Sequence, residues 1–375
     1  MLKNFYKYFF LSYWRNIDRK ILTCFFILFF LGLFFSFSST SFLAGERLNK
    51  DYYFFFSKHL IFTFLALIIM ITISVIKTEL LIKLTIPLFV ISFILLAFVP
   101  IIGIEVKGAK RWLDLYFFRL QPIEILKPFF ILITAKILTF EKLKKSQIKY
   151  TLSFILLCSV IVLLVDQPDL GQSILLTFSW IATVFISGVN LVYLFVFFLI
   201  FLICLSSLLF FFSEKFGYIT NRLIAFLDSD QGDQFQSSSA LNAIKQGGLM
   251  GQGMGEGILK ESVPEAHTDY IIAVISEEYG SLVTIMILII FLYISFRIIK
   301  NCFTHENKFI KISLSGLATL LIFQMFIHAG VNTNLLPTTG MTLPFLSYGG
   351  SSLIGSAILA GLVLNYTKNK AYLYD

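Results

Sequence analysis

Long apolar segments separated by short polar ones run along the whole chain. They predict ten membrane spans, at residues 21–43, 59–76, 80–102, 123–140, 150–165, 171–187, 190–212, 269–298, 310–330 and 351–366. A helix of about 20 apolar residues crosses roughly 30 Å of hydrocarbon. These runs are continuous, whereas the strands of a membrane β-barrel alternate in hydrophobicity, so helices are expected. The predicted fold class is an all-α polytopic membrane protein, with residues 1–375 forming one transmembrane domain.

Polar residues gather in four stretches on one predicted face, at residues 105–127, 166–172, 213–269 and 332–352. In the large outer loop, 213–268, the sequence SSSALNAIKQGG predicts a short surface helix that ends at glycine. The GGLMGQGMGEG run after it has no preceding strand, so a reentrant or hinge segment is favoured over a phosphate-binding loop. Proline and glycine in 166–172 and 332–352 likewise favour broken or reentrant helices, which membranes tolerate only where protein or water satisfies the backbone.

Composition and charge support this topology. The chain is 57% hydrophobic and 14% charged, far from the values of soluble domains, with a net charge of +8. The majority of the 30 Lys and Arg residues fall in the segments that are cytoplasmic if both termini lie inside, as the positive-inside rule expects. The net charge is therefore mostly a topology signal, and nothing in the sequence requires nucleic acid as a partner.

The sequence SVPEAHTDYIIAV places acids and an imidazole directly before a predicted span. Thr268 or Asp269 could simply cap the helix that follows. The alternative is a polar site at the water-exposed edge of the membrane. A cap needs only one side-chain acceptor, whereas Glu261, Glu265 and His267 add two more carboxylates and an imidazole.

Further acids lie within or between spans. Charged groups about two turns into a span, such as Glu277 and Glu278, should face the bundle or a polar cavity, either in a salt bridge with a residue such as Lys127 or in a catalytic role. Asp166 and Asp169 have no local cation, so at least one of them is expected to find a partner in another loop.

The partners considered for these aspartates are Lys127 and Arg111. Glu124 and Lys127, three residues apart, can pair within one helix. The stretch 105–127 brings Lys107, Lys110 and Arg111 together with aromatic residues. It predicts either interfacial anchoring or an anion site for a lipid headgroup or pyrophosphate. Gln121 and Ser347, in neighbouring outer stretches, complete the candidate substrate-binding residues.

Four motifs give the chain a family resemblance. KGAKRWLDL with LQPIEILKP, then QPDLGQ, GQGMGEGILKESVPEAHTDYIIAVISEEYG and TTGMTLPFLSYGGSS resemble, in this order, the motifs of the SEDS family (shape, elongation, division and sporulation proteins). The GEGILKESVPEAHTD version and QGDQFQSSSALNAI are more similar to the division-type members (FtsW) than to the elongation-type members (RodA). Ile123 stands where the family usually has Ser, Thr339 stands where many division-type members have Lys, and LPTTG is closer to the elongation type.

The resemblance implies an inverting glycosyltransferase that polymerises lipid II into peptidoglycan, with undecaprenyl pyrophosphate as the leaving group. Asp269 occupies the family's essential acidic position, and its implied role is general base. A divalent cation, Mg²⁺ or Mn²⁺, could be shared by Asp269 or Glu265, while lysine and arginine can stabilise pyrophosphate without metal. The implied partners are a class B penicillin-binding protein and other membrane proteins of the division complex.

The implied location is the bacterial cytoplasmic (inner) membrane at the division septum, with the active face periplasmic. Two functions of other classes also fit ten spans and intramembrane acids. One is a lipid II flippase or transporter, although transporter sites usually lie at the bilayer midplane and these polar residues crowd one face. The other is a non-catalytic scaffold for the division machinery.

Overall fold

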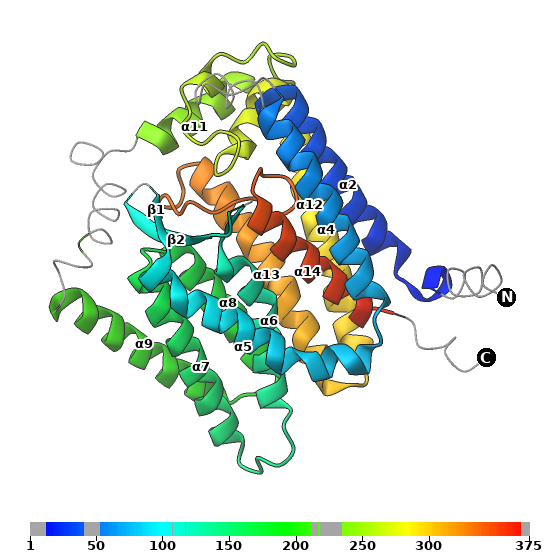
Figure 1. The fold of residues 1–375 in the computed structure, drawn as a ribbon, viewed down its shortest axis with the longest axis vertical. Helices are drawn as coiled ribbons and strands as arrows, with labels where there is room; N and C mark the ends of the chain where they lie inside the picture. The colour runs from blue at the N-terminus through cyan, green and yellow to red at the C-terminus, as the bar shows by residue number, and fades with distance from the viewer. Residues whose placement is uncertain are drawn as a thin grey trace.

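The computed structural model describes residues 13–40, 53–106, 108–116, 118–211, 217 and 235–368. Within these ranges the chain forms a bundle of ten apolar helices (Figure 1). They are α2 (Arg19–Phe35), α4 (Phe54–Val75), α5 (Thr78–Ile102), α6 (Pro122–Leu138), α7 (Ser146–Asp166), α8 (Leu170–Ile186), α9 (Leu191–Phe211), α12 (Ile271–Thr304), α13 (Lys308–Asn332) and α14 (Gly350–Tyr366). A π-helical turn, Ser36–Thr40, continues α2.

Six of the described helices are long and apolar enough to cross a membrane by themselves, namely α2, α4, α5, α7, α12 and α13. Helices α6, α8 and α14 have 17 residues each and pack among the longer ones. The all-α polytopic membrane fold predicted from the hydrophobic pattern is confirmed. Helix ends lie within a few residues of the predicted ends, except that α2 ends earlier and α12 extends further, to Thr304.

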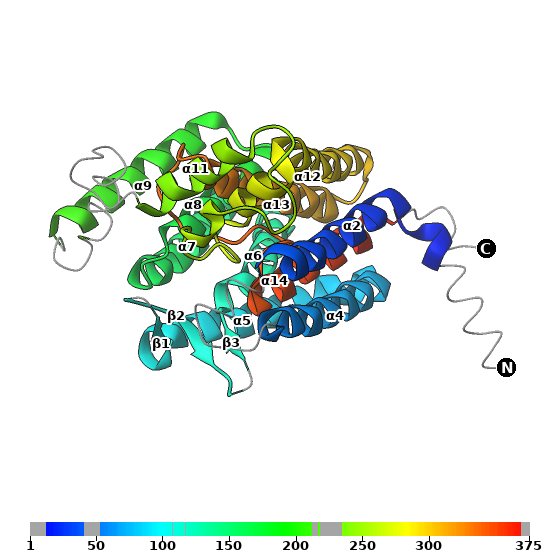
Figure 2. The same cartoon turned by 90° about the horizontal axis from the view of Figure 1, so that it is seen from above.

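Helix α14 is the centre of the bundle. All of its residues from Ser351 to Tyr366 are buried, and Figure 2 shows it surrounded by α2, α4, α6 and α13. Glycines allow this close packing: a Cβ on Gly355 would lie 2.9 Å from the carbonyl carbon of Glu124, and one on Gly361 would lie 2.8 Å from the Cβ of Ile73. Small residues play this role between membrane helices because backbones must approach closely when no hydrophobic effect drives association.

The stretch between α5 and α6 contains a small sheet that the hydrophobic pattern did not predict. Strands β1 (Ile104–Val106), β2 (Ala109–Asp114) and β3 (Arg119–Leu120) pair antiparallel in the order β1-β2-β3. Strands of two to six residues give too little alternation to be recognised in a sequence. The sheet presents β2 to the outer ends of the helices.

The large outer loop contains the predicted surface helix, α11 (Phe235–Gly247), which buries Ser237, Ala240, Ala243 and Gly247 along one face. After it, the glycine-rich segment 247–257 packs on a break in α12 at Gly280, where φ is 85°. The amides of Gln252 and Gly253 donate to the carbonyls of Glu277 and Glu278, at 2.9 and 3.0 Å. The segment therefore completes the backbone hydrogen bonds that the helix break leaves open.

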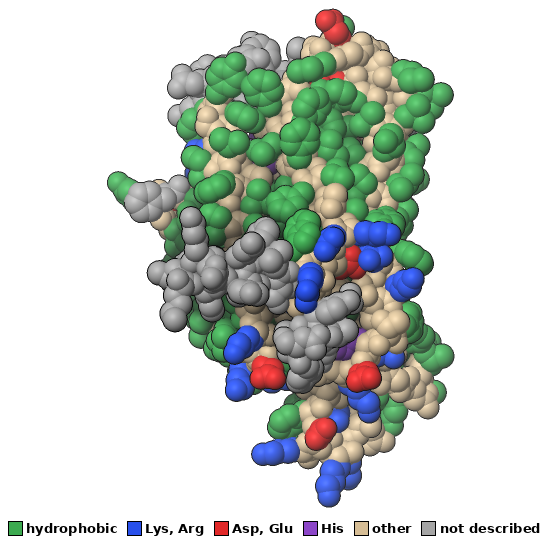
Figure 3. All heavy atoms as spheres, turned by 90° about the vertical axis from the view of Figure 1, so that its right-hand side faces the viewer, with side chains coloured by type: hydrophobic (Ala, Val, Ile, Leu, Met, Phe, Trp, Pro, Cys, Tyr) green, Lys and Arg blue, Asp and Glu red, His purple; other side chains and the backbone are tan. Residues whose placement is uncertain are grey.

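The two ends of the bundle differ in charge. Figure 3 shows hydrophobic side chains over the upper part of the face that carries α2, with Lys and Arg side chains gathered over its lower part. The described polar elements β1 to β3 and α11 lie at the opposite, outer end (Figure 1).

Candidate active site at the outer ends of the helices

The carboxylate of Asp269 and the guanidinium of Arg111 both lie beside an exposed turn of the loop between α13 and α14. A Cβ built on Gly340 would lie 3.6 Å from Asp269 Oδ2 and 3.6 Å from Arg111 Nη1. Gly340 has φ 67°, a backbone conformation that favours glycine, and both charged residues are partly exposed. Arg111, Asp269 and Gly340 come from three segments far apart in the sequence. The fold thus brings one acid and one cation to the same turn.

Arg111 is held in place by the corner between α7 and α8. Its Nε donates to the carbonyl of Gln167 at 3.0 Å, and its Nη2 donates to the carbonyl of Pro168. Two guanidinium nitrogens are therefore fixed by backbone, which leaves Nη1 directed at the Gly340 turn. Lys110, the preceding residue of β2, is exposed and lies on the opposite face of the strand, since successive side chains alternate. The structure therefore brings Arg111, and not Lys110, to Asp269.

The start of α12 is capped by another helix. A cap by Thr268 or Asp269 was one of the two alternatives for this stretch, but the N-cap residue is Tyr270, and it makes no side-chain cap. Asn332, fully buried at the end of α13, supplies the cap instead. Its Oδ1 accepts from the amide of Ala273 at 3.1 Å, and its Nδ2 donates to the carbonyl of Asp269 at 3.1 Å.

A tight turn precedes Asp269. The carbonyl of Glu265, at φ 53°, accepts from the amides of Thr268, Asp269 and Tyr270 at 3.0 to 3.3 Å. The Thr268 hydroxyl also donates to Glu265 Oε2, at 3.0 Å. Backbone bonds to one carbonyl thus fix where the Asp269 side chain leaves the chain.

The loop between α13 and α14 clamps this turn. The hydroxyl of Ser347 donates to the carbonyl of Thr268 at 2.6 Å and accepts from the amide of Leu343 at 2.9 Å. Because Ser347 is buried and its hydroxyl is engaged in this way, we assign it a structural role in place of the expected substrate contact. The amide of Tyr348 donates to the carbonyl of His267 at 3.0 Å.

His267 lies among aromatic rings at the edge of the site. Its ring centroid is 5.6 Å from that of Phe55 on α4 and 5.8 Å from that of Tyr348. Burial raises the pKa of the Tyr348 hydroxyl above its ordinary value. His267 and Glu265 are both partly exposed within a few residues of Asp269, so substrate contacts by these two residues stay a prediction.

A buried chain of polar side chains lies beneath the site. Lys127 Nζ pairs with Glu124 Oε2 at 2.9 Å, as the i, i+3 spacing predicted, and donates to Gln324 Oε1 at 3.2 Å. Gln172 Nε2 donates to Glu124 Oε1 at 2.8 Å, and Gln324 Nε2 donates to the carbonyl of Thr342 at 3.1 Å. Helices α6, α8 and α13 and the loop before α14 are joined by these bonds.

Asp169 links this network of buried polar side chains to the site. Its Oδ2 accepts from Gln121 Nε2 at 3.4 Å, and its Oδ1 accepts from the amide of Gln172 as the N-cap of α8. Burial raises the pKa of Asp169, and the nearby Arg111 charge opposes the rise. Gln121 was expected to bind substrate. In the structure it is the N-cap residue of α6, and its backbone N–H donates to Ser351 Oγ at 2.9 Å.

The partner expected for the two glutamates of α12 is corrected by the structure. Glu278 pairs with Lys260, not with Lys127. Glu277 accepts from the amides of Leu259 and Lys260 at 2.7 and 2.6 Å. Both acids are buried, and they hold the end of the outer loop against the helix break, so their role is structural.

Two of the predicted site residues cannot be assessed. Lys107 and the side chain of Glu261 lie outside the described residues. Within the described ranges, no three His, Cys, Asp or Glu side chains come together as a group that could hold a metal ion. We therefore derive no step through a divalent cation.

Sequence reasoning missed Asn332, Lys260, Gln172 and Gln324. A usable signal exists for Gln172 and Gln324, because an amide side chain inside an apolar span is costly unless it is paired within the bundle. Asn332 and Lys260 have no such signal, since both lie in stretches predicted as polar.

Comparisons with known proteins find relatives over nearly the whole chain. Residues 18–372 match the family of FtsW, RodA and SpoVE, described as "Cell cycle protein". A probable peptidoglycan glycosyltransferase FtsW of Caulobacter vibrioides is 31% identical, covering 96% of this chain and 92% of the relative. Another protein of that name, from Geobacter sp. strain M18, is 35% identical, covering 92% and 93%.

Solved structures share the fold. The rod shape determining protein RodA of Thermus thermophilus has a TM-score of 0.68 at 25% identity, covering 94% of this chain and 97% of that one. A chain of a peptidoglycan synthase complex, solved in a study of the coordination of polymerization and crosslinking, has a TM-score of 0.76 at 24% identity with the same coverage. The SEDS resemblance of the motifs is thereby confirmed, and the chain belongs to the FtsW, RodA and SpoVE family of cell cycle proteins.

Proposed function

We propose that this membrane protein is a peptidoglycan glycosyltransferase that polymerises lipid II into glycan strands, with Asp269 as the general base. The observation that carries the proposal is that the Asp269 carboxylate and the Arg111 guanidinium both lie beside the exposed Gly340 turn. Membership of the family and the names of its relatives, such as the FtsW of Caulobacter vibrioides, support the reaction.

In the proposed reaction, the 4-hydroxyl oxygen of the acceptor sugar attacks the anomeric carbon of the donor. A new glycosidic C–O bond forms with inversion, while the bond from that carbon to undecaprenyl pyrophosphate breaks. Asp269 accepts the hydroxyl proton, which requires its carboxylate to be ionised, as its partial exposure allows. Arg111 is positioned to stabilise the negative charge that develops on the departing pyrophosphate.

The proposed cellular setting is the bacterial inner membrane at the division septum, with both termini cytoplasmic and the site periplasmic. The basic end of the bundle would then face the cytoplasm, as the positive-inside rule requires. The relatives named FtsW favour the division type over the elongation type. A class B penicillin-binding protein and other division proteins are the proposed partners, and they would contact lipid-facing helices.

Labelled lipid II tests the function directly. Purified protein with its cognate transpeptidase is expected to convert lipid II to glycan strands, measured by gel separation of the products. Transport of lipid II across vesicles without polymer would indicate the flippase instead, and neither polymer nor transport would indicate a scaffold. Titrating Mg²⁺ and Mn²⁺ in the same assay tests whether a divalent cation takes part.

Replacing Arg111 by Lys should lower kcat by up to about 100-fold, with a smaller change in the KM for lipid II. Lysine keeps one charge, but it cannot hold two backbone carbonyls and also present a nitrogen to the site. The matched control is Lys110→Gln, on the opposite face of β2, which should stay within about threefold of wild type. Wild-type kcat in Arg111→Lys would show that the charge at this position, and not the geometry of the guanidinium, matters.

A further inference from the structure

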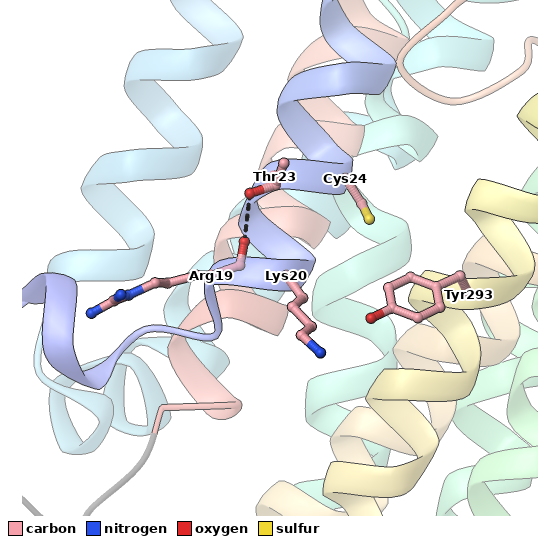
Figure 4. Close-up of a pocket in the computed structure, with 5 residues that line it drawn as sticks. All are labelled: Arg19, Lys20, Thr23, Cys24 and Tyr293. Atoms are coloured by element: carbon pink, nitrogen blue, oxygen red, sulfur yellow. Dashed lines mark hydrogen bonds between the residues drawn. The ribbon is translucent and has the colours of Figure 1, made fainter.

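A pocket lies between α2 and α12 at the basic end of the bundle, opposite the proposed active site. It has a volume of about 320 Å³ and is lined by Arg19, Lys20, Thr23, Cys24 and Tyr293. Figure 4 shows the Lys20 ammonium and the Tyr293 hydroxyl directed toward each other across it, with the Cys24 thiol above them. Arg19 points away, because its Nε donates to the carbonyl of Trp14 at 3.2 Å. The Thr23 hydroxyl donates to the carbonyl of Arg19 at 2.8 Å, which leaves the Lys20 ammonium and the Tyr293 hydroxyl as the polar groups of the pocket besides the Cys24 thiol.

The pocket is framed by contacts between the same two helices. Below it, Arg297 Nε donates to the Asp18 carboxylate at 2.8 and 2.7 Å, and the Arg297 guanidinium lies beside the Tyr293 phenol. At the other end, the rings of Phe34 and Phe35 lie 5.8 and 5.2 Å from that of Tyr279. Helices α2 and α12 therefore contact each other below the pocket and again at Tyr279, and the surface between these two contacts, which includes the pocket, is called the crevice here.

Apolar side chains continue from the pocket along both helices at helical spacing. On α2 they follow Lys20 at positions 27, 30 and 34, and on α12 they precede Tyr293 at positions 289, 286 and 282, ending at the ring of Tyr279. Phe30 and Met286 are 67% and 65% exposed. From Lys20 to Phe34 the helix rises about 21 Å, more than the roughly 15 Å depth of one leaflet. The apolar stripe above the pocket is therefore long enough for an acyl chain to lie along it.

We infer that this crevice binds one anionic phospholipid, with the headgroup phosphate at Lys20 and Tyr293 and an acyl chain between α2 and α12. The positive charge of Lys20 favours a lipid with an anionic headgroup. An ammonium and a phenol hydroxyl suit a phosphodiester, which accepts charge-assisted hydrogen bonds. The apolar stripe suits the attached chain. The lipid would belong to the cytoplasmic leaflet if the basic end lies inside. The inference does not depend on the reaction at Asp269.

Native mass spectrometry of the full-length protein tests the site, with phosphatidylglycerol and phosphatidylcholine of the same acyl chains as probes. Wild type should retain one phosphatidylglycerol in preference to phosphatidylcholine. Lys20→Gln should weaken phosphatidylglycerol retention roughly tenfold, the loss of one charge-assisted hydrogen bond. Lys83→Gln, an exposed lysine near the basic end of α5, is the matched control and should not change it. Met286→Trp, which fills the crevice, should lower retention while Lys20 is intact.

Three results would overturn the inference. The first is retention of phosphatidylglycerol by Lys20→Gln at the wild-type level. The second is equal weakening by Lys83→Gln, which would indicate diffuse charge. The third is displacement of the lipid by glycerol phosphate or inorganic phosphate alone, which would indicate a free-anion site. Gel filtration of each variant checks that it is folded, and a dimer in the mass spectra would point to a second copy as the occupant.

Discussion

Asp269→Asn is expected to reduce glycan polymerisation by about 100-fold to 10,000-fold, the usual contribution of a positioned general base. The amide keeps the shape of the side chain but cannot accept the proton from the acceptor hydroxyl. The fold should be unaffected, because the turn before α12 is held by backbone bonds to Glu265 and by Asn332. Rates are measured with purified protein, labelled lipid II and the cognate transpeptidase.

The matched control for this substitution is Asp114→Asn, the same chemical change on an exposed outer residue. Its Oδ1 accepts from the amide of Tyr116, which an asparagine oxygen can also do. The control should keep wild-type activity. Wild-type polymerisation by Asp269→Asn would refute the assignment of the base, and a lower melting temperature of that variant would mean that the residue is structural.

Lys127→Met is expected to produce the largest loss of stability, about 3–5 kcal/mol of unfolding free energy. Lys127 and Glu124 are both buried and 2.9 Å apart, so the substitution leaves a carboxylate without its cation among apolar side chains. It also removes the hydrogen bond to Gln324. Thermal unfolding in detergent, followed by gel filtration or tryptophan fluorescence, measures the effect.

A double variant separates charge from packing. Glu124→Gln combined with Lys127→Met removes both charges, and the new amide can still accept from Gln172. Replacing a whole buried pair costs less than breaking it, so the double variant should melt above the single Lys127→Met variant. If the two melt together, the loss comes from the missing lysine stem and not from the uncompensated charge.

Much of the fold could be predicted from local sequence. The hydrophobic runs predicted the helices of the bundle because a span must be long and apolar wherever it packs. The surface helix α11 followed from its own composition and glycine stop. The i, i+3 spacing predicted the Glu124 and Lys127 pair, since both side chains lie on one helix. In each case the interactions that favour the structure are made by residues close together in the sequence.

The long-range partners could not be predicted in this way. Glu278 pairs with Lys260 only because the glycine-rich segment folds back onto the break at Gly280. Thr268 and Asp269 were good caps by residue type, but the cap comes from Asn332 on another helix. Ser347 was expected at the substrate and instead clamps the backbone of Thr268. A buried polar group takes whichever partner the packed bundle brings to it.

The sequence by itself determined the class of fold and the stretches in which polar residues collect, and its motifs singled out Asp269 as the candidate base, because apolar length and motif order are properties of the chain. The tertiary structure decided that Arg111, anchored on the corner of α7 and α8, is the cation facing Asp269, and that Lys110 is not. Residues 111, 269 and 340 approach one another only after the helices pack, and the strength of their interactions depends on distances that no linear spacing specifies.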